Sequence, residues 1–119
     1  MTLERLEVLL LQLRDAAADL DALMRDTQRS TLDSDLRTRM AVAMVLMIVS
    51  DLAGRIQTLS PELVATKPQV PWTEIRGLRN RLAHDYFNLN LDVLWVTATE
   101  SVPALMQTLR DVIPPHNRS

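Results

Sequence analysis

Apolar residues recur every three or four positions over the long segments of this chain, and this spacing restricts the fold to packed helices. Residues at that spacing share one face of an α-helix. Alternation of period two, which marks a half-buried strand, is absent, and the chain has only two glycines. We therefore predict an all-α fold. In the first helix, expected over about 3–25, the apolar positions are Leu3, Leu6, Leu9, Leu10, Leu13, Ala17, Leu20 and Met24.

A second helix is expected from about Asp35 to Leu59, and it is apolar over most of its circumference. One stripe consists of Val42, Val45, Leu46, Val49, Leu52, Ala53 and Ile56, and it is widened by Met40, Met44, Met47 and Ile48. Such a helix is either central to a monomeric core or shared between a core and a partner. Methionine suits irregular contact surfaces, so a homodimer seam is one of the two interpretations. The longest apolar run is about half of the roughly 20 residues that span a bilayer, so no membrane contact is expected.

Polar and proline-rich stretches separate the expected helices. We predict a loop over Thr27–Asp35 and a connector over Lys67–Pro71, followed by a third helix that opens at Pro71. Asn90 should cap a fourth helix, and Pro103 should kink or restart it. Its expected buried face comprises Leu94, Trp95, Ala98, Val102, Leu105, Met106 and Leu109.

Composition narrows the function classes. The 119 residues suit a single domain over 1–119, with a flexible tail over 114–119. The lack of cysteine excludes disulfides, a thiol nucleophile and a cysteine-based metal site, and it favours the cytoplasm. We expect no cofactor. A net charge of −2 argues against a broad basic surface for long nucleic acid, so any RNA contact should be local.

The densest group of reactive side chains lies in the stretch RGLRNRLAHDY, from Arg76 to Tyr86. On a wheel of about 100° per residue, Ile75, Leu78 and Leu82 form an apolar stripe on the third helix. We place a polar face on the opposite side. It consists of Arg76, Arg79, Asn80, Ala83 and His84.

Arginine and histidine together can cleave an RNA phosphodiester without a metal. The guanidinium of Arg79 would stabilise charge on the phosphate oxygens. His84 would take the 2′-hydroxyl proton or donate one to the leaving 5′-oxygen. Because the 2′-hydroxyl is the nucleophile, the substrate would be RNA and not DNA. One histidine cannot easily act as acid and base in the same step, whereas a symmetric dimer would supply two.

A simpler interpretation of the same residues stays open. Exposed arginines on a helix are usually only solvated, and a histidine near a helix end often serves the helix terminus. Asp51 either pairs with one of the arginines or marks where the second helix reaches the surface.

The stretch from Arg79 to Tyr86 also resembles a known family. It matches the pattern of Arg, four residues, His, one residue and Tyr of the HepT-like branch of the HEPN superfamily. These are ribonuclease toxins paired with minimal nucleotidyltransferase antitoxins of the MntA type. The resemblance covers Val42 to Ile113, and the further matching segments are Ser60–Leu63, Pro71–Ile75, Gly77–Leu82, Tyr86–Phe87, Leu91–Asp92, Trp95 and Pro103.

This resemblance implies a four- to five-helix HEPN-type bundle that forms a homodimer. Its cleft would join the catalytic residues Arg79 and His84 of both protomers, supported by Asn80 and Arg76. Tyr86 would be the residue that the antitoxin adenylylates, adding bulk and phosphate charge at the cleft. The pair would form a type VII-like toxin–antitoxin system.

The sequence departs from the family in the second helix. Met47 stands where an acidic residue is common, and Asp51 stands where a glutamate is usual, so we assign Asp51 only a supporting role. The alternative function is a non-catalytic helical partner, or a substrate-presenting subunit, of a nucleotidyltransferase. A purely structural dimerisation bundle would leave the polar face of the third helix unexplained.

Overall fold

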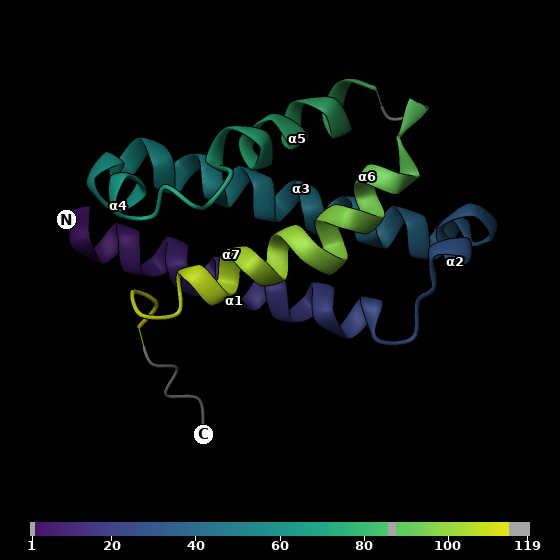
Figure 1. Cartoon of the computed structure of the whole chain (residues 1–119), viewed down its shortest axis with the longest axis horizontal. Coiled ribbons are helices and arrows are strands. Elements are labelled where there is room, and N and C mark those ends of the chain that lie inside the picture. The colour runs from purple at the N-terminus through teal and green to yellow at the C-terminus, as the bar shows by residue number, and fades with distance from the viewer. Residues whose placement is uncertain (1, 86–87, 115–119) are drawn as a thin grey trace.

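The computed structural model describes residues 2–85 and 88–114. These residues form helices and no strand, which confirms the all-α prediction. The three long helices lie side by side: α1 (Thr2–Met24), α3 (Leu36–Leu59) and α5 (Trp72–His84), with α3 in the middle (Figure 1). Both outer helices pack on α3, and α3 is the main neighbour of α5. The central position of α3 follows from its wide apolar surface.

The C-terminal part of the chain crosses one face of this layer. It is a continuous helical segment made of α6 (Leu91–Val96), a π-helical turn η2 (Thr97–Ser101) and α7 (Val102–Thr108), which packs on α1 and α3 (Figure 1). Asn90 accepts hydrogen bonds from the backbone of Asp92 and Val93, so it caps α6 as predicted. The core lies between this segment and the layer. Its fully buried large side chains are Leu13, Leu20, Leu32, Leu46, Ile56, Leu94, Leu105 and Leu109.

Pro103 restarts the helix, as the sequence predicted, and the π-helical turn comes directly before it. Proline has no N–H, and its ring clashes with the carbonyl four residues earlier in an α-helix. In η2 the N–H of Val102 instead donates to the carbonyl oxygen of Thr97, five residues back. This wider turn changes the backbone hydrogen-bond pattern before the proline is reached.

The loop predicted over Thr27–Asp35 is wrong in part, because a short helix α2 (Arg29–Ser34) forms there. Gln28 and Thr31 form a reciprocal capping box at its start, and Leu32 is fully buried against the core. The capping residues that suggested a loop therefore start a helix. The predicted start of the second helix is correct, since the Asp35 side chain accepts hydrogen bonds from the backbone N–H groups of Arg37 and Thr38 and caps α3 at its N-terminus. Hydrogen bonds from Thr38 lower the pKa of Asp35.

The connector predicted over Lys67–Pro71 is confirmed, and a short helix lies between it and α3. Ser60 caps the short helix α4 (Pro61–Thr66), with Pro61 at a first-turn position. The proline-rich segment after α4 is not helical, and α5 starts at Trp72. The Trp72 indole N–H donates to the Lys67 carbonyl at 3.1 Å, and Lys67 forms an ion pair with Asp111 at 2.8 Å. These contacts fix the start of α5 relative to the C-terminal segment.

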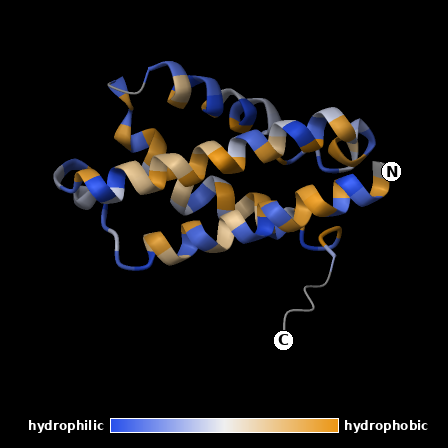
Figure 2. Cartoon of the chain, turned by 180° about the vertical axis from the view of Figure 1, so that it is seen from behind, coloured by the Kyte–Doolittle hydropathy of each residue, from blue (hydrophilic) through white to orange (hydrophobic). Residues whose placement is uncertain are grey.

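One face of α3 stays open on the side away from α6 and α7. Figure 2 shows this side, with α3 exposed between α1 and α5 and hydrophobic along its middle. An apolar patch there consists of Met40, Met44 and Ile48, which are 39%, 53% and 40% exposed. By length and composition α3 could cross a membrane, but much of its apolar stretch is buried by the packing of other helices. We therefore describe α3 as the central helix of the bundle.

Candidate functional site

The arginine- and histidine-bearing stretch lies on α5, and its apolar side is buried as predicted. Trp72, Ile75, Leu78 and Leu82 pack toward α3 and the core. Acidic Glu74 lies in the first turn, and Arg81 and His84 lie in the last turn, an arrangement that matches the helix dipole. The helix therefore holds a fixed orientation, with its reactive residues exposed.

Arg79 does not lie opposite the buried stripe, and that part of the wheel prediction is wrong. On the wheel it stands about 40° from Ile75, at the edge of the stripe, which is the side that faces α3. Its Nε lies 3.3 Å from Oδ1 of Asp51 on α3. Asp51 therefore pairs with one of the arginines, which was one of the two possibilities left open by the sequence.

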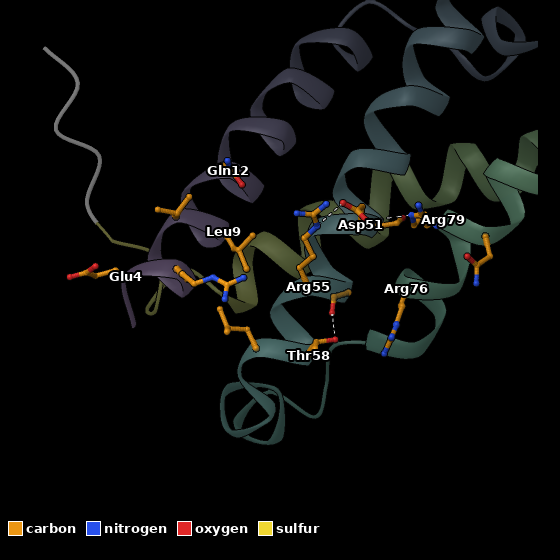
Figure 3. Close-up of a pocket in the computed structure, with 14 residues that line it drawn as sticks. Glu4, Leu9, Gln12, Asp51, Arg55, Thr58, Arg76 and Arg79 are labelled. Atoms are coloured by element: carbon orange, nitrogen blue, oxygen red, sulfur yellow. Dashed lines mark hydrogen bonds and ion pairs between the residues drawn. The ribbon is translucent and has the colours of Figure 1, made fainter. Parts of the chain in front are cut away.

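Asp51 also contacts a second arginine, which the motif does not include. Its Oδ2 accepts a hydrogen bond from Nε of Arg55 at 2.9 Å. The two carboxylate oxygens thus hold two guanidinium groups from different helices, as Figure 3 shows. These side chains are 36% to 65% exposed, so the network orients the arginines more than it stabilises the fold.

The Asp51 network lies in a groove of about 1110 Å³ between α1, α3 and α5 (Figure 3). Its lining contains four arginines and two carboxylates, a local formal charge of +2 in a chain whose net charge is −2. The charged lining residues are Glu4, Arg5, Asp51, Arg55, Arg76 and Arg79. Positive charge is thus concentrated locally in a chain that is acidic overall.

Arg5 and Arg55 are the groove residues that sequence reasoning missed. Arg55 follows Asp51 by four residues, and this helical ion-pair spacing was a usable signal. Arg5 lies on α1 and gave no signal, because only the packing of α1 on α3 brings it to the groove.

The supporting residues Arg76 and Asn80 both line the groove. A Cβ placed on Gly54 would lie 3.5 Å from Cγ of Arg76, so the Arg76 stem extends along α3 at a position with no side chain. Within residues 2–85 and 88–114, neither Arg76 nor Arg5 forms an ion pair. Their guanidinium groups are therefore available to an anionic ligand.

His84 is exposed at the end of α5 and does not line the groove. On the helical wheel His84 stands about 140° from Arg79, so the two side chains leave the helix in different directions. A single chain therefore does not bring Arg79 and His84 into a common pocket. Tyr86 and His116 lie outside the described residues. Among the described residues, no three His, Asp or Glu side chains gather where they could hold a metal ion.

Comparison with known proteins gives consistent results. A family model described as "Ribonuclease HepT-like" matches residues 13–112. A "Putative RNase" of Methanocaldococcus jannaschii is 28% identical over 112 residues, covering 94% of this chain and 100% of the relative. A "Probable ribonuclease HepT" of Thermococcus cleftensis is 32% identical over 71 residues, covering 60% of this chain and 62% of the relative.

A "Putative RNase" of Caldanaerobacter subterraneus is 31% identical over 58 residues, covering 49% of this chain and 52% of the relative. The chain thus spans between half and two thirds of the length of two of these three relatives. No solved structure matches the chain significantly.

Proposed function

Because the chain belongs to the HepT-like ribonuclease family, we propose that it is a metal-independent endoribonuclease toxin that uses Arg79 and His84. The observation that carries this proposal is the placement of Arg79. It lies at the wall of a groove with positive local charge, and a carboxylate orients its guanidinium. A fixed fork of N–H donors beside a basic hollow suits a phosphodiester in which negative charge is growing.

The proposed reaction uses the 2′-hydroxyl of the RNA as the nucleophile. A neutral His84 removes the 2′-hydroxyl proton while the 2′-oxygen bonds to phosphorus. The bond from phosphorus to the 5′-oxygen breaks, and a second His84, which is protonated, gives its proton to that oxygen. The products are a 2′,3′-cyclic phosphate and a free 5′-hydroxyl. Arg79 stabilises the additional charge on the non-bridging oxygens.

Two protonation states of histidine are needed, which is why we propose that the active form is a homodimer. His84 lies outside the groove that holds Arg79 of its own chain. The apolar patch formed by Met40, Met44 and Ile48 is exposed on the open face of α3. A second copy seated there would cover this patch and bring a second α5 to the same cleft.

We further propose that a minimal nucleotidyltransferase antitoxin controls this activity by adenylylating Tyr86, which follows His84 by two residues. An added adenylate would bring bulk and negative charge close to the proposed proton donor and acceptor. The substrate phosphate and the modification would then repel each other. The intact mass of protein co-expressed with such an antitoxin tests this step, and an unmodified mass would contradict it.

The nuclease proposal is tested with purified protein and an end-labelled RNA in the presence of EDTA. Wild type should yield fragments ending in 2′,3′-cyclic phosphate, whereas Arg79→Ala and His84→Ala should lose cleavage by about 100-fold or more. Arg25→Ala is the control, because Arg25 lies directly after the C-terminal end of α1, outside the groove, in an exposed ion pair with Asp21.

Equal cleavage by all four proteins would indicate a contaminating nuclease and reject the assignment. If wild type neither cleaves RNA nor arrests growth when expressed without its partner, the protein is instead the non-catalytic companion of a nucleotidyltransferase.

A further inference from the structure

We infer that the groove between α1, α3 and α5 binds the phosphate backbone of the RNA next to the cleavage point, with Arg5 and Arg55 as phosphate-binding residues. This inference rests on the proposed RNA substrate. It adds two residues that belong to no motif, and it gives the substrate a direction, away from Arg79 toward the N-terminal part of α1.

The first support is the origin of the charges. The four groove arginines come from three helices, and α1 is far from α5 in the sequence. Their convergence on one hollow concentrates positive charge in a chain that is acidic overall. Local concentration of guanidinium groups is the usual signature of a phosphate-binding surface.

The second support is the state of the guanidinium groups. Arg5 and Arg76 form no ion pair within the described ranges, whereas Arg55 and Arg79 share the single carboxylate of Asp51. Each oxygen of Asp51 takes one Nε, which leaves terminal N–H groups of both arginines for a ligand. The groove therefore contains donors that its own residues do not satisfy.

The third support is what lines the rest of the groove. The uncharged lining consists of Val8, Leu9, Gln12, Ser50, Gly54, Thr58, Leu59 and Asn80. Among these described residues there is no aromatic side chain on which a base could stack. A groove rich in arginine and without a stacking platform binds the backbone rather than the bases, so it should tolerate any sequence.

The fourth support is continuity with the proposed cleavage point. Arg79 is itself part of the groove wall, and Arg76 follows it toward the start of α5, where its stem lies along Gly54 of α3. A phosphate held by Arg79 therefore has its neighbouring phosphates on one side within reach of Arg76 and Arg55. Arg5 lies on the opposite wall.

The test measures binding separately from cleavage. A fluorescein-labelled 12-nucleotide 2′-O-methyl RNA, which lacks the nucleophile, is titrated with His84→Ala protein at several salt concentrations. Arg5→Gln and Arg55→Gln, each in the His84→Ala background, should raise the dissociation constant about fivefold. Each should reduce the slope of log affinity against log salt by about 0.7, the value for one phosphate contact on a single strand.

The matched control is Arg25→Gln in the same background. Arg25 pairs with Asp21 at the same four-residue spacing as Arg55 with Asp51, and the two arginine side chains are similarly exposed, but the Arg25 pair lies outside the groove. Its affinity and salt slope should equal those of the parent. Unchanged binding by the Arg5 and Arg55 variants, or an equal loss for Arg25→Gln, would overturn the inference.

A labelled poly-glutamate peptide tests whether the groove serves a protein partner instead. Binding of the peptide but not the RNA through Arg5 and Arg55 would also overturn the inference. The nuclease proposal fails independently: wild type that binds RNA through the groove and cleaves nothing would contradict the reaction and leave the groove assignment standing.

Discussion

The open face of α3 has two halves of different chemistry, which meet next to Asp51. Toward the start of the helix it presents the apolar patch of Met40, Met44 and Ile48, and toward the end it presents Asp51 and Arg55. These five residues fall within about 80° on a helical wheel, so they form one continuous strip. A single helix face can therefore offer one surface suited to a second protein chain and another suited to an anion.

The two halves should differ in what disrupts them. Binding of a partner to the apolar half is driven by the removal of apolar surface from water, and salt does not weaken this effect. Binding to the charged half is driven by contacts between arginines and phosphates, and salt weakens these contacts strongly. Four experiments test this division, in order of decreasing expected effect.

The largest effect is expected from a charge in the apolar half. Met44→Glu would place a carboxylate of each protomer in the proposed dimer contact, so we expect a monomer and a loss of RNA cleavage on the order of 100-fold. Sedimentation and the cleavage assay measure the two effects. Val96→Glu is the control, since Val96 is 44% exposed on α6 and lies outside the patch. A dimeric and active Met44→Glu protein would contradict the role of the patch.

Salt should separate the two halves without any substitution. If all four groove arginines contact phosphates, a rise from about 50 to 200 mM salt should weaken binding of the 2′-O-methyl RNA about 50-fold. The dimer dissociation constant should stay within about threefold over the same range, because apolar contacts are not screened. Equal salt dependence of both equilibria would refute the division.

A neutral residue at the junction should affect catalysis and binding in opposite directions. Asp51→Asn removes the charge that holds Arg79, so we expect kcat to fall about tenfold. The same change adds one net positive charge to the groove, so RNA affinity should rise about fivefold. Stopped-flow and equilibrium titrations give the two values. Asp21→Asn, which disrupts the Arg25 pair on α1, should change neither.

The smallest effect is expected from a methyl group at the floor of the groove. Gly54→Ala places a Cβ 3.5 Å from Cγ of Arg76, which is an ordinary contact, and it removes a glycine from a helix interior. The free energy of unfolding should rise by roughly 0.5–1 kcal/mol, with RNA binding unchanged. Gly77→Ala on α5, where a Cβ has no neighbour within 4 Å, should give a similar gain. Weaker RNA binding by Gly54→Ala alone would show that Arg76 needs the space above Gly54.

The sequence predicts the long helices well because their limits depend on local chemistry. Asp35 and Ser60 each cap a helix through their own side chains, so the limits of α3 can be recognised without tertiary information. The missed helix α2 depends instead on Leu32, a single apolar residue in a polar stretch. Leu32 is buried because α2 packs against α3 and α6.

The site is less predictable than the fold because its parts meet only through packing. Helical spacing identifies the exposed stretch of α5, but the position of Arg79 at the edge of the buried stripe matters only once Asp51 of α3 faces it. Arg5 is one of several arginines on exposed helix surfaces, and nothing local distinguishes it. The family pattern indicates the chemistry of Arg79 and His84, and it contains no information on the groove.

The packing of α5 mainly on one neighbour has a consequence for motion. A helix that docks on a single partner has few tertiary contacts to break, so its local opening should need less free energy than the unfolding of α3. Amide hydrogens of α5 should therefore exchange with solvent earlier than those of the central helix. Any ligand that bridges α5 to α1 would slow this exchange. The fraction of molecules in which α5 is held closed would then rise with the fraction of sites that the ligand occupies.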